Sequence, residues 1–140
     1  MCSSEQDSIS QATQGIHHLG LSVPDIGETK DFFIQMLGFQ QVGGKPDYPA
    51  VFVSDGATML TLWQLDSEGG TVSFNRRKNA GLHHFALKVG SIEALQALHA
   101  RLVGNGAVEV EFAPEALGDS DLQHMMCFIP GGVRVEFISA

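Results

Sequence analysis

Several residue types are scarce in this 140-residue chain, and each shortage excludes a class of protein. There are only two cysteines, Cys2 in a polar terminal segment and Cys127 in an apolar run, so the chain has no disulfide framework. It has eight basic and sixteen acidic residues, and the resulting net charge of −8 argues against nucleic acid and anionic membrane as partners. This charge would suit a cationic small molecule.

Long apolar stretches are missing as well. No apolar run approaches the length that spans a membrane, and the first residues lack the basic and apolar regions of a signal peptide. Together with the unpaired cysteines, this predicts a cytoplasmic protein. Residues 1–14, rich in serine and glutamine, are predicted to be a disordered tail. The whole length fits one domain, in which two halves would have to share a sheet or a core.

The most informative pattern is an internal repeat. The segment Ile16–Val23 (IHHLGLSV) returns 66 residues later as Leu82–Val89 (LHHFALKV), and a glycine precedes each copy. Within the first copy the aliphatic residues alternate with His18, Gly20 and Ser22, which is the period-two pattern of a strand. The chain therefore consists of two similar halves.

Each copy of the repeat leads into the same order of elements. Asp25 followed by Glu28 resembles a capping box, and apolar residues at helical spacing then predict a helix that ends at Gly38. Ser91 can cap a second helix. We predict βαβββ twice, with a first module at 15–66, a linker at 67–79 and a second module at 80–140. The predicted strands are 16–23, 39–42, 50–54, 58–64, 82–89, 107–112, 124–129 and 133–138.

Three polar residues stand at matched places in this plan. His18 and His84 lie on the first strand of each half and Glu136 on the last strand of the second, all on the face opposite the aliphatic one. A strongly curved sheet would bring them together in a cup. Two imidazoles and one carboxylate suit Fe(II), Mn(II), Ni(II) or Zn(II) and leave open positions for substrate. A single histidine is more often a hydrogen-bonded surface residue, but its repetition at one offset favours a metal site.

Other candidate residues are less diagnostic. Thr61 occupies in the first half the place that Glu136 occupies in the second. We predict that Thr61, Trp63 and Met126 line a substrate pocket, although core packing is the commoner use of such apolar residues. His124 can face either the cup or solvent. The sequence contains no nucleophile elbow and no phosphate-binding glycine loop, so covalent catalysis has no support.

With these motifs the chain resembles the vicinal oxygen chelate superfamily, which includes glyoxalase I, bleomycin-resistance proteins, fosfomycin-resistance enzymes and extradiol dioxygenases. The resemblance covers residues 15–139 and is carried by Ile16–Asp25, Phe33–Phe39, Leu82–Leu87 and Pro130–Phe137. It implies an α+β fold of two tandem βαβββ modules, with curved mixed sheets and the helices outside. It also implies a homodimer.

The resemblance places His18, Thr61, His84 and Glu136 at the four ligand positions of the family. Because threonine replaces a carboxylate, the remaining His, His and Glu are similar to the ligands of the extradiol dioxygenases and fosfomycin-resistance enzymes. The implied function is a lyase or isomerase of glyoxalase I type, with Glu136 as catalytic base and a divalent metal (Fe, Ni, Zn or Mn) chelating a small oxygen-bearing substrate.

Two alternatives stay open at this point. One is an Fe(II) dioxygenase of extradiol type, and the other is a metal-free protein of bleomycin-resistance type that sequesters a cationic compound. The sequence also leaves open whether the cup is completed within one chain or across a swapped dimer.

Overall fold

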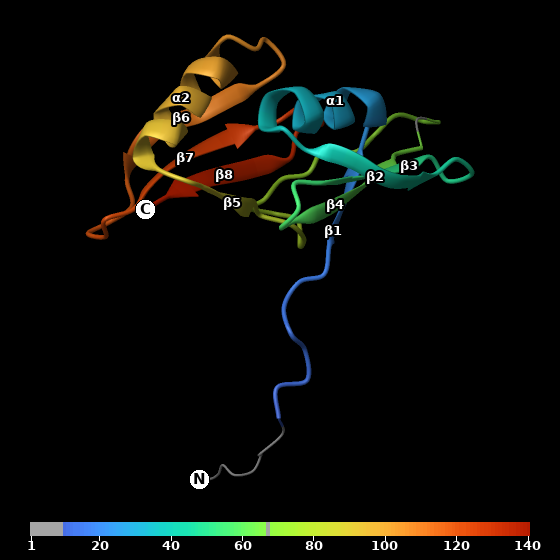
Figure 1. The fold of residues 1–140 in the computed structure, drawn as a ribbon. Helices are drawn as coiled ribbons and strands as arrows, with labels where there is room; N and C mark the ends of the chain where they lie inside the picture. Colours follow the sequence, from blue (N-terminus) through green and yellow to red (C-terminus); the bar gives the residue numbers. More distant parts are fainter. Residues whose placement is uncertain (1–9, 67) are drawn as a thin grey trace.

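The computed structural model describes residues 10–66 and 68–140, which form two four-stranded sheets with one helix beside each (Figure 1). The fold is α+β with the order βαβββ repeated, as the sequence predicts. The first half contains β1 (Leu19–Val23), α1 (Ile26–Leu37), β2 (Gln40–Lys45), β3 (Ala50–Ser54) and β4 (Met59–Gln64). The second half contains β5 (Phe85–Val89), α2 (Ile92–Val103), β6 (Glu109–Ala116), β7 (Gln123–Phe128) and β8 (Arg134–Ser139).

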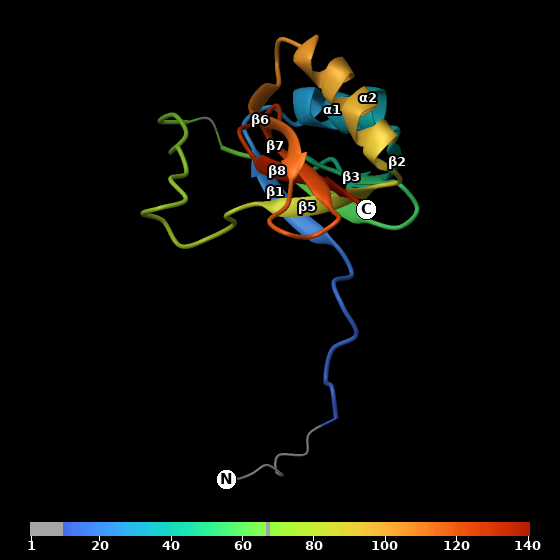
Figure 2. The same cartoon turned by 90° about the vertical axis from the view of Figure 1, so that its left-hand side faces the viewer.

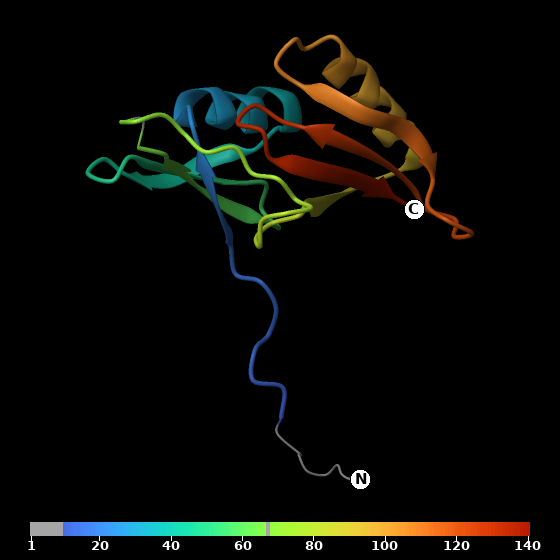
Figure 3. The same cartoon turned by 180° about the vertical axis from the view of Figure 1, so that it is seen from behind.

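In each sheet the first strand of the half pairs with the last. The strand orders are β1-β4-β3-β2 and β5-β8-β7-β6, and the pairs β1–β4 and β5–β8 are parallel while the other pairs are antiparallel. Both helices lie on the same side of the sheets (Figure 2). Residues 10–18, which precede β1, extend away from the other side (Figure 3).

Two of the predicted strands begin later than the repeated pattern suggests. β1 starts at Leu19 and β5 at Phe85, because pairing with β4 and β8 starts at those residues. His18 and His84 therefore lie just ahead of their strands, not within them. β6, in contrast, ends later than predicted. Register shifts against β7 keep it paired as far as Ala116, beyond the end predicted at residue 112.

The helix ends follow the local sequence signals. The Asp25 side chain accepts a hydrogen bond of 3.1 Å from the Glu28 amide, and Ser91 accepts one of 3.0 Å from the Ala94 amide. Gly38 ends α1 at φ 78°, a left-handed conformation that glycine adopts without steric cost. Each helix has 12 residues, and no helix in the described part of the chain is long and apolar enough to cross a membrane.

One hydrophobic core joins the two halves. Buried residues of both form a single cluster, which includes Leu21, Val23, Phe33, Val53, Leu60, Leu62, Leu95, Leu98, Leu102, Met125, Val135 and Phe137. Thr29 on α1 is fully buried, and its hydroxyl donates a 2.9 Å hydrogen bond to the Pro130 carbonyl in the β7–β8 turn. Arg101 on α2 donates to the Met36 carbonyl at 3.1 Å. The halves are thus joined through helices and turns, since their sheets are separate.

Of the two cysteines, the structure describes only Cys127. Cys127 is fully buried, and this burial raises the pKa of its thiol to about 11. The thiol is therefore protonated at neutral pH and protected from oxidants. Cys2 and the other residues of 1–9, which include most of the predicted tail, lie outside the described residues.

Two matched turns test the packing between the halves. Gly131 has φ 105°, and a Cβ atom there would lie 3.0 Å from Thr29 Oγ1 and 3.3 Å from a Val23 methyl. Gly56, its counterpart in the β3–β4 turn, has φ 94° and open space. Both alanine variants incur the cost of a left-handed backbone, which exceeds about 1 kcal/mol, but only Gly131→Ala also displaces buried neighbours.

We therefore expect Gly131→Ala to lower the free energy of unfolding by clearly more than Gly56→Ala does. Urea unfolding of both variants beside the wild type measures this difference. Equal losses would mean that the β7–β8 turn does not pack against α1 in solution.

Candidate metal and substrate site

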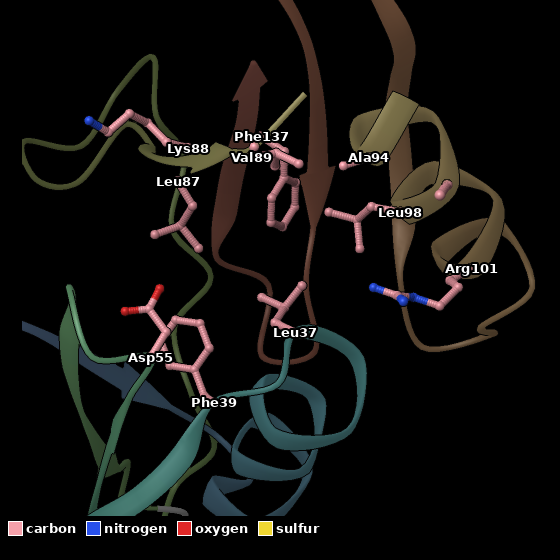
Figure 4. Close-up of a pocket in the computed structure, with 12 residues that line it drawn as sticks. Leu37, Phe39, Asp55, Leu87, Lys88, Val89, Ala94, Leu98, Arg101 and Phe137 are labelled. Atoms are coloured by element: carbon pink, nitrogen blue, oxygen red, sulfur yellow. The ribbon is translucent and has the colours of Figure 1, made fainter. Parts of the chain in front are cut away.

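One cavity lies between α2 and the β3–β4 turn (Figure 4). It measures about 390 Å³ and is lined mainly by apolar side chains such as Leu37, Phe39 and Leu98. Asp55 and Arg101 lie on opposite sides of it in Figure 4. The β3–β4 turn of the first half meets the second half at this cavity. In the second half, the matching β7–β8 turn packs tightly against the first half at Gly131. No predicted ligand lines it, so we interpret it as a packing gap.

Polar side chains gather on the other face of the second sheet. His84 Nε2 lies 3.2 Å from Glu136 Oε1, and His124 Nδ1 lies 2.6 Å from Glu136 Oε2. His124 Nε2 is 3.9 Å from Glu115 Oε2. The Glu136 side chain is only 11% exposed, and a buried carboxylate needs such partners. Glu136 is therefore held between two imidazoles.

The register of the strands explains this cluster. In the parallel pair β5–β8, Ala86 lies opposite Glu136, and His84 is two residues before Ala86 on the same face. On the other side of β8, Met126 lies opposite Glu136, and His124 is two residues before Met126. Val135 and Phe137 alternate with Glu136 and enter the core.

His18 does not join this cluster within one chain. Its Nδ1 lies 2.9 Å from Nδ1 of His17. In the described part of the chain, no hydrogen bond or ion pair connects His18 with His84 or Glu136. The structure of the single chain thus brings together two of the three predicted ligands and adds His124.

The matching place in the first half is apolar and aromatic. Thr61 is buried and its hydroxyl accepts a 2.9 Å hydrogen bond from Trp63 Nε1. A Cβ on Gly20 would lie 3.2 Å from that hydroxyl, so glycine leaves room for the pair. The rings of Tyr48 and Trp63 meet edge to face, with centroids 4.9 Å apart. The single tryptophan and single tyrosine of the chain therefore lie together on this face.

A second polar network adjoins His84. Arg134 holds both oxygens of Glu111, at 2.8 and 3.2 Å, and Arg76 lies 3.7 Å from the same carboxylate. Arg134 Nη1 is 3.4 Å from His83 Nδ1, which is 2.8 Å from His84 Nδ1. The hydrogen bond from Arg134 lowers the pKa of Glu111. Partial desolvation and the charge of Arg134 lower the pKa of His83.

A second cavity, of about 540 Å³, opens beside this network. It lies between β1, the segment that joins the halves, and β8. Its lining combines Arg76, His83 and Arg134 with the apolar Phe74 and the hydroxyl of Ser22. The cavity thus offers positive charge and apolar surface beside His83, the neighbour of His84, although neither His84 nor Glu136 lines it.

His84 and Glu136 are spaced as two ligands of one metal ion, but the described residues give the cluster no third ligand. Two ligands that bind one ion at about 2.1 Å each, at an angle near 100°, lie about 3.2 Å apart, and His84 Nε2 and Glu136 Oε1 are 3.2 Å apart. At 2.6 Å, His124 is instead hydrogen-bonded to the carboxylate. Within residues 10–66 and 68–140, no three His, Cys, Asp or Glu side chains are grouped to hold a metal. A third protein ligand would have to come from outside this cluster.

The partners of these ligands do not follow from the sequence. The repeat predicts His84 and Glu136 but leaves His124 facing either the cup or solvent, and no pattern points to Glu115, Glu111 or Arg134. The alternation of His124 with Met126 indicates that both lie on one face of β7. Which residues of β8 they meet depends on the register set by the turn between the two strands.

Residues 15–137 match the sequence pattern of the Glyoxalase/Bleomycin resistance protein/Dioxygenase superfamily. The chain belongs to this superfamily. Its members commonly use a divalent metal and bind small-molecule substrates. No curated protein matches the sequence.

Solved structures show the same fold. A glyoxylase/bleomycin resistance protein/dioxygenase domain from Frankia sp. EAN1pec has a TM-score of 0.76 at 22% identity, over 92% of this chain and 93% of that one. A lactoylglutathione lyase from Agrobacterium tumefaciens has a TM-score of 0.69 at 19% identity, over 93% and 96%. A fosfomycin resistance protein from Listeria monocytogenes has a TM-score of 0.71 at 14% identity, over 91% and 94%.

The Glu111–Arg134 pair should make the stability of the fold depend on pH. Because the pKa of Glu111 is lower in the folded chain than its ordinary value of 4.5, the pair stabilises the fold above that pH, and this contribution is lost as the pH falls. We expect the stability of Glu111→Gln to depend less on pH than that of the wild type below about pH 5.

Thermal unfolding between about pH 3 and pH 7 measures this dependence. Glu109→Gln is the control, because it removes an exposed carboxylate of the same strand and leaves the Arg134 pair intact. Parallel curves for the wild type and Glu111→Gln would contradict the prediction.

Proposed function

We propose that this protein is a metal-dependent lyase or isomerase of glyoxalase I type. The observation that carries the proposal is the His84–Glu136 pair, whose donor atoms are spaced as two ligands of one divalent ion. Superfamily membership and the cavity beside His83, the neighbour of His84, support it. Fe, Ni, Zn and Mn all accept imidazole and carboxylate ligands.

His18 is the third ligand in this proposal. Since His18 is not joined to His84 within one chain, we infer that a second copy supplies it and that the working unit is a homodimer. Each cup would then combine the first half of one copy with the second half of the other. The exposed position of His18 ahead of β1 is consistent with a contact of this kind.

The side chains around the pair have separate tasks. Glu136 would accept a proton from a hydroxyl-bearing substrate carbon next to a carbonyl and return it to the carbonyl carbon. The hydroxyl proton would pass to the former carbonyl oxygen, which completes an isomerisation without net proton loss. His124 would hold the carboxylate in place through its 2.6 Å hydrogen bond. A divalent metal held by His84 and Glu136 would supply Lewis-acid polarisation of substrate oxygens.

The adjoining cavity indicates the kind of substrate. Arg76 and Arg134 share the single carboxylate of Glu111, so the three groups carry one net positive charge. In a chain with a net charge of −8, this is a local site for an anion. We infer a small substrate with two adjacent oxygens and an anionic group, whose apolar part would lie along Phe74.

Metal content tests the proposal. Protein purified without chelators should carry about one divalent metal per chain, and His84→Ala should lose it. His99→Ala is the control, because His99 lies on α2 on the other side of the sheet. Absence of metal in the wild type, with none taken up from added Fe, Mn, Ni or Zn, would refute the enzyme proposal.

Mixing two inactive variants tests the shared cup. A dimer of His18→Ala and His84→Ala chains would contain one intact site if ligands come from different copies, and none if they come from the same chain. Random pairing makes about half of the dimers heterodimers, so recovery of about a quarter of the wild-type metal after co-refolding of equal amounts supports the shared site. No recovery would place all ligands in one chain.

A second candidate is favoured by the aromatic cluster of the first half. The Tyr48–Trp63 pair, beside Phe52, offers an aromatic surface in a strongly acidic chain, as a metal-free protein that sequesters a flat cationic compound would need. This function would not depend on the His84–Glu136 pair, so metal removal would leave it unchanged.

The single tryptophan makes this candidate directly measurable. Titration with methyl viologen, a flat aromatic cation, should quench the Trp63 fluorescence with saturation, and Tyr48→Leu should weaken binding about twofold to fivefold. Benzoate, an aromatic anion, is the control and should not bind there. Linear, unsaturable quenching would exclude this function.

A further inference from the structure

The neighbouring histidines of each repeat form the same contact. Nδ1 of His17 lies 2.9 Å from Nδ1 of His18, and Nδ1 of His83 lies 2.8 Å from Nδ1 of His84. A hydrogen bond between two such nitrogens needs one donor and one acceptor, so one ring carries its proton on Nδ1 and the other does not. The pair alone leaves the direction open.

Arg134 determines the direction in the second half. Its guanidinium has donors and no acceptor, and Nη1 lies 3.4 Å from His83 Nδ1, so this nitrogen must accept. Glu111 holds Arg134 by two hydrogen bonds, and the Arg134 side chain is only 12% exposed, which keeps the guanidinium in place. With His83 Nδ1 as the acceptor shared by the long Arg134 contact and the 2.8 Å contact, His84 Nδ1 is the donor.

A neutral imidazole with its proton on Nδ1 has a lone pair on Nε2. In His84 this is the nitrogen 3.2 Å from Glu136 Oε1, so a lone pair and a carboxylate oxygen point toward the same space. We propose that His83 and Arg134 are positioning residues that hold His84 in the tautomer able to bind a metal through Nε2. The role in metal binding rests on the function proposed above, whereas the tautomer does not.

The first half lacks this arrangement. Alignment of the two hairpin turns, Gly56 with Gly131, makes Met59 the counterpart of Arg134. A thioether cannot donate a hydrogen bond to His17, and within residues 10–66 and 68–140 the only hydrogen bond of the His17–His18 pair is the one between the two rings. By this proposal, the tautomer of the candidate ligand is fixed only in the second copy of the repeat, at His84. His17 provides a matched control for His83.

The ring ¹⁵N signals of His84 in metal-free protein at about pH 8 test the tautomer directly. We expect protonated Nδ1 and unprotonated Nε2 in the wild type. His83→Leu removes the acceptor and should shift His84 toward the Nε2-protonated form, while His83→Asn, whose amide oxygen can accept, should restore the wild-type pattern. His17→Leu should leave the His84 signals unchanged.

To test the role of Arg134, the variant must not leave the Glu111 carboxylate without its partner. Arg134→Met in a Glu111→Gln background reproduces the residue of the first half, and Glu111→Gln alone is its control. The double variant should lose the Nδ1-protonated form and the single variant should keep it. A wild-type His84 that is protonated on Nε2 or on both nitrogens at this pH would overturn the proposal, as would unchanged signals in His83→Leu.

Metal affinity is the second readout. Titration with Zn²⁺ should show about 10- to 100-fold weaker binding by His83→Leu and near wild-type binding by His83→Asn. Equal affinity of all variants would refute the positioning role even if the tautomer is correct. Failure of the wild type to bind any metal would refute the proposed function, and the ¹⁵N result would then stand by itself.

Discussion

The parallel pairing of the first and last strands in each half is the constraint on which the rest of the structure depends. In the second half the β5–β8 register sets Ala86 beside Glu136 and so brings His84 to the same carboxylate. The neighbours of Glu136, Val135 and Phe137, enter the core. A slip of one residue would expose Phe137 and bury the carboxylate among apolar side chains. Core packing therefore holds the polar cluster in register.

Burial makes the partners of Glu136 necessary. It is the one buried carboxylate among the described residues, and an unpaired charge at such a depth destabilises a fold strongly. In the single chain the 2.6 Å hydrogen bond with His124 offsets part of this cost. A bound divalent cation would do the same with greater charge, so this cluster connects stability to ligand binding.

The two halves share a backbone plan and differ in the residues on the sheet faces that point away from the helices. Thr61, Trp63 and Met59 stand in the first half where the aligned positions of the second hold Glu136, Ile138 and Arg134. One face is consequently aromatic and hydrogen-bonded within itself, and the other is charged. The contacts between the halves differ in the same way, since Gly131 packs against α1 while a cavity lies beside the Gly56 turn. A repeated fold thus carries two different surfaces.

The sequence by itself determined the βαβββ repeat, the helix caps at Asp25 and Ser91, and the face on which Glu136 lies. These depend on local periodicity and on side chains within a few residues of one another, so they can be derived from the order of residues. Tertiary structure alone decided that His124 and His84 meet at Glu136, that Arg134 reaches His83, and that His18 stays apart. Such contacts join separate strands, and their geometry depends on register, strand starts and the packing of the halves, which no local pattern specifies.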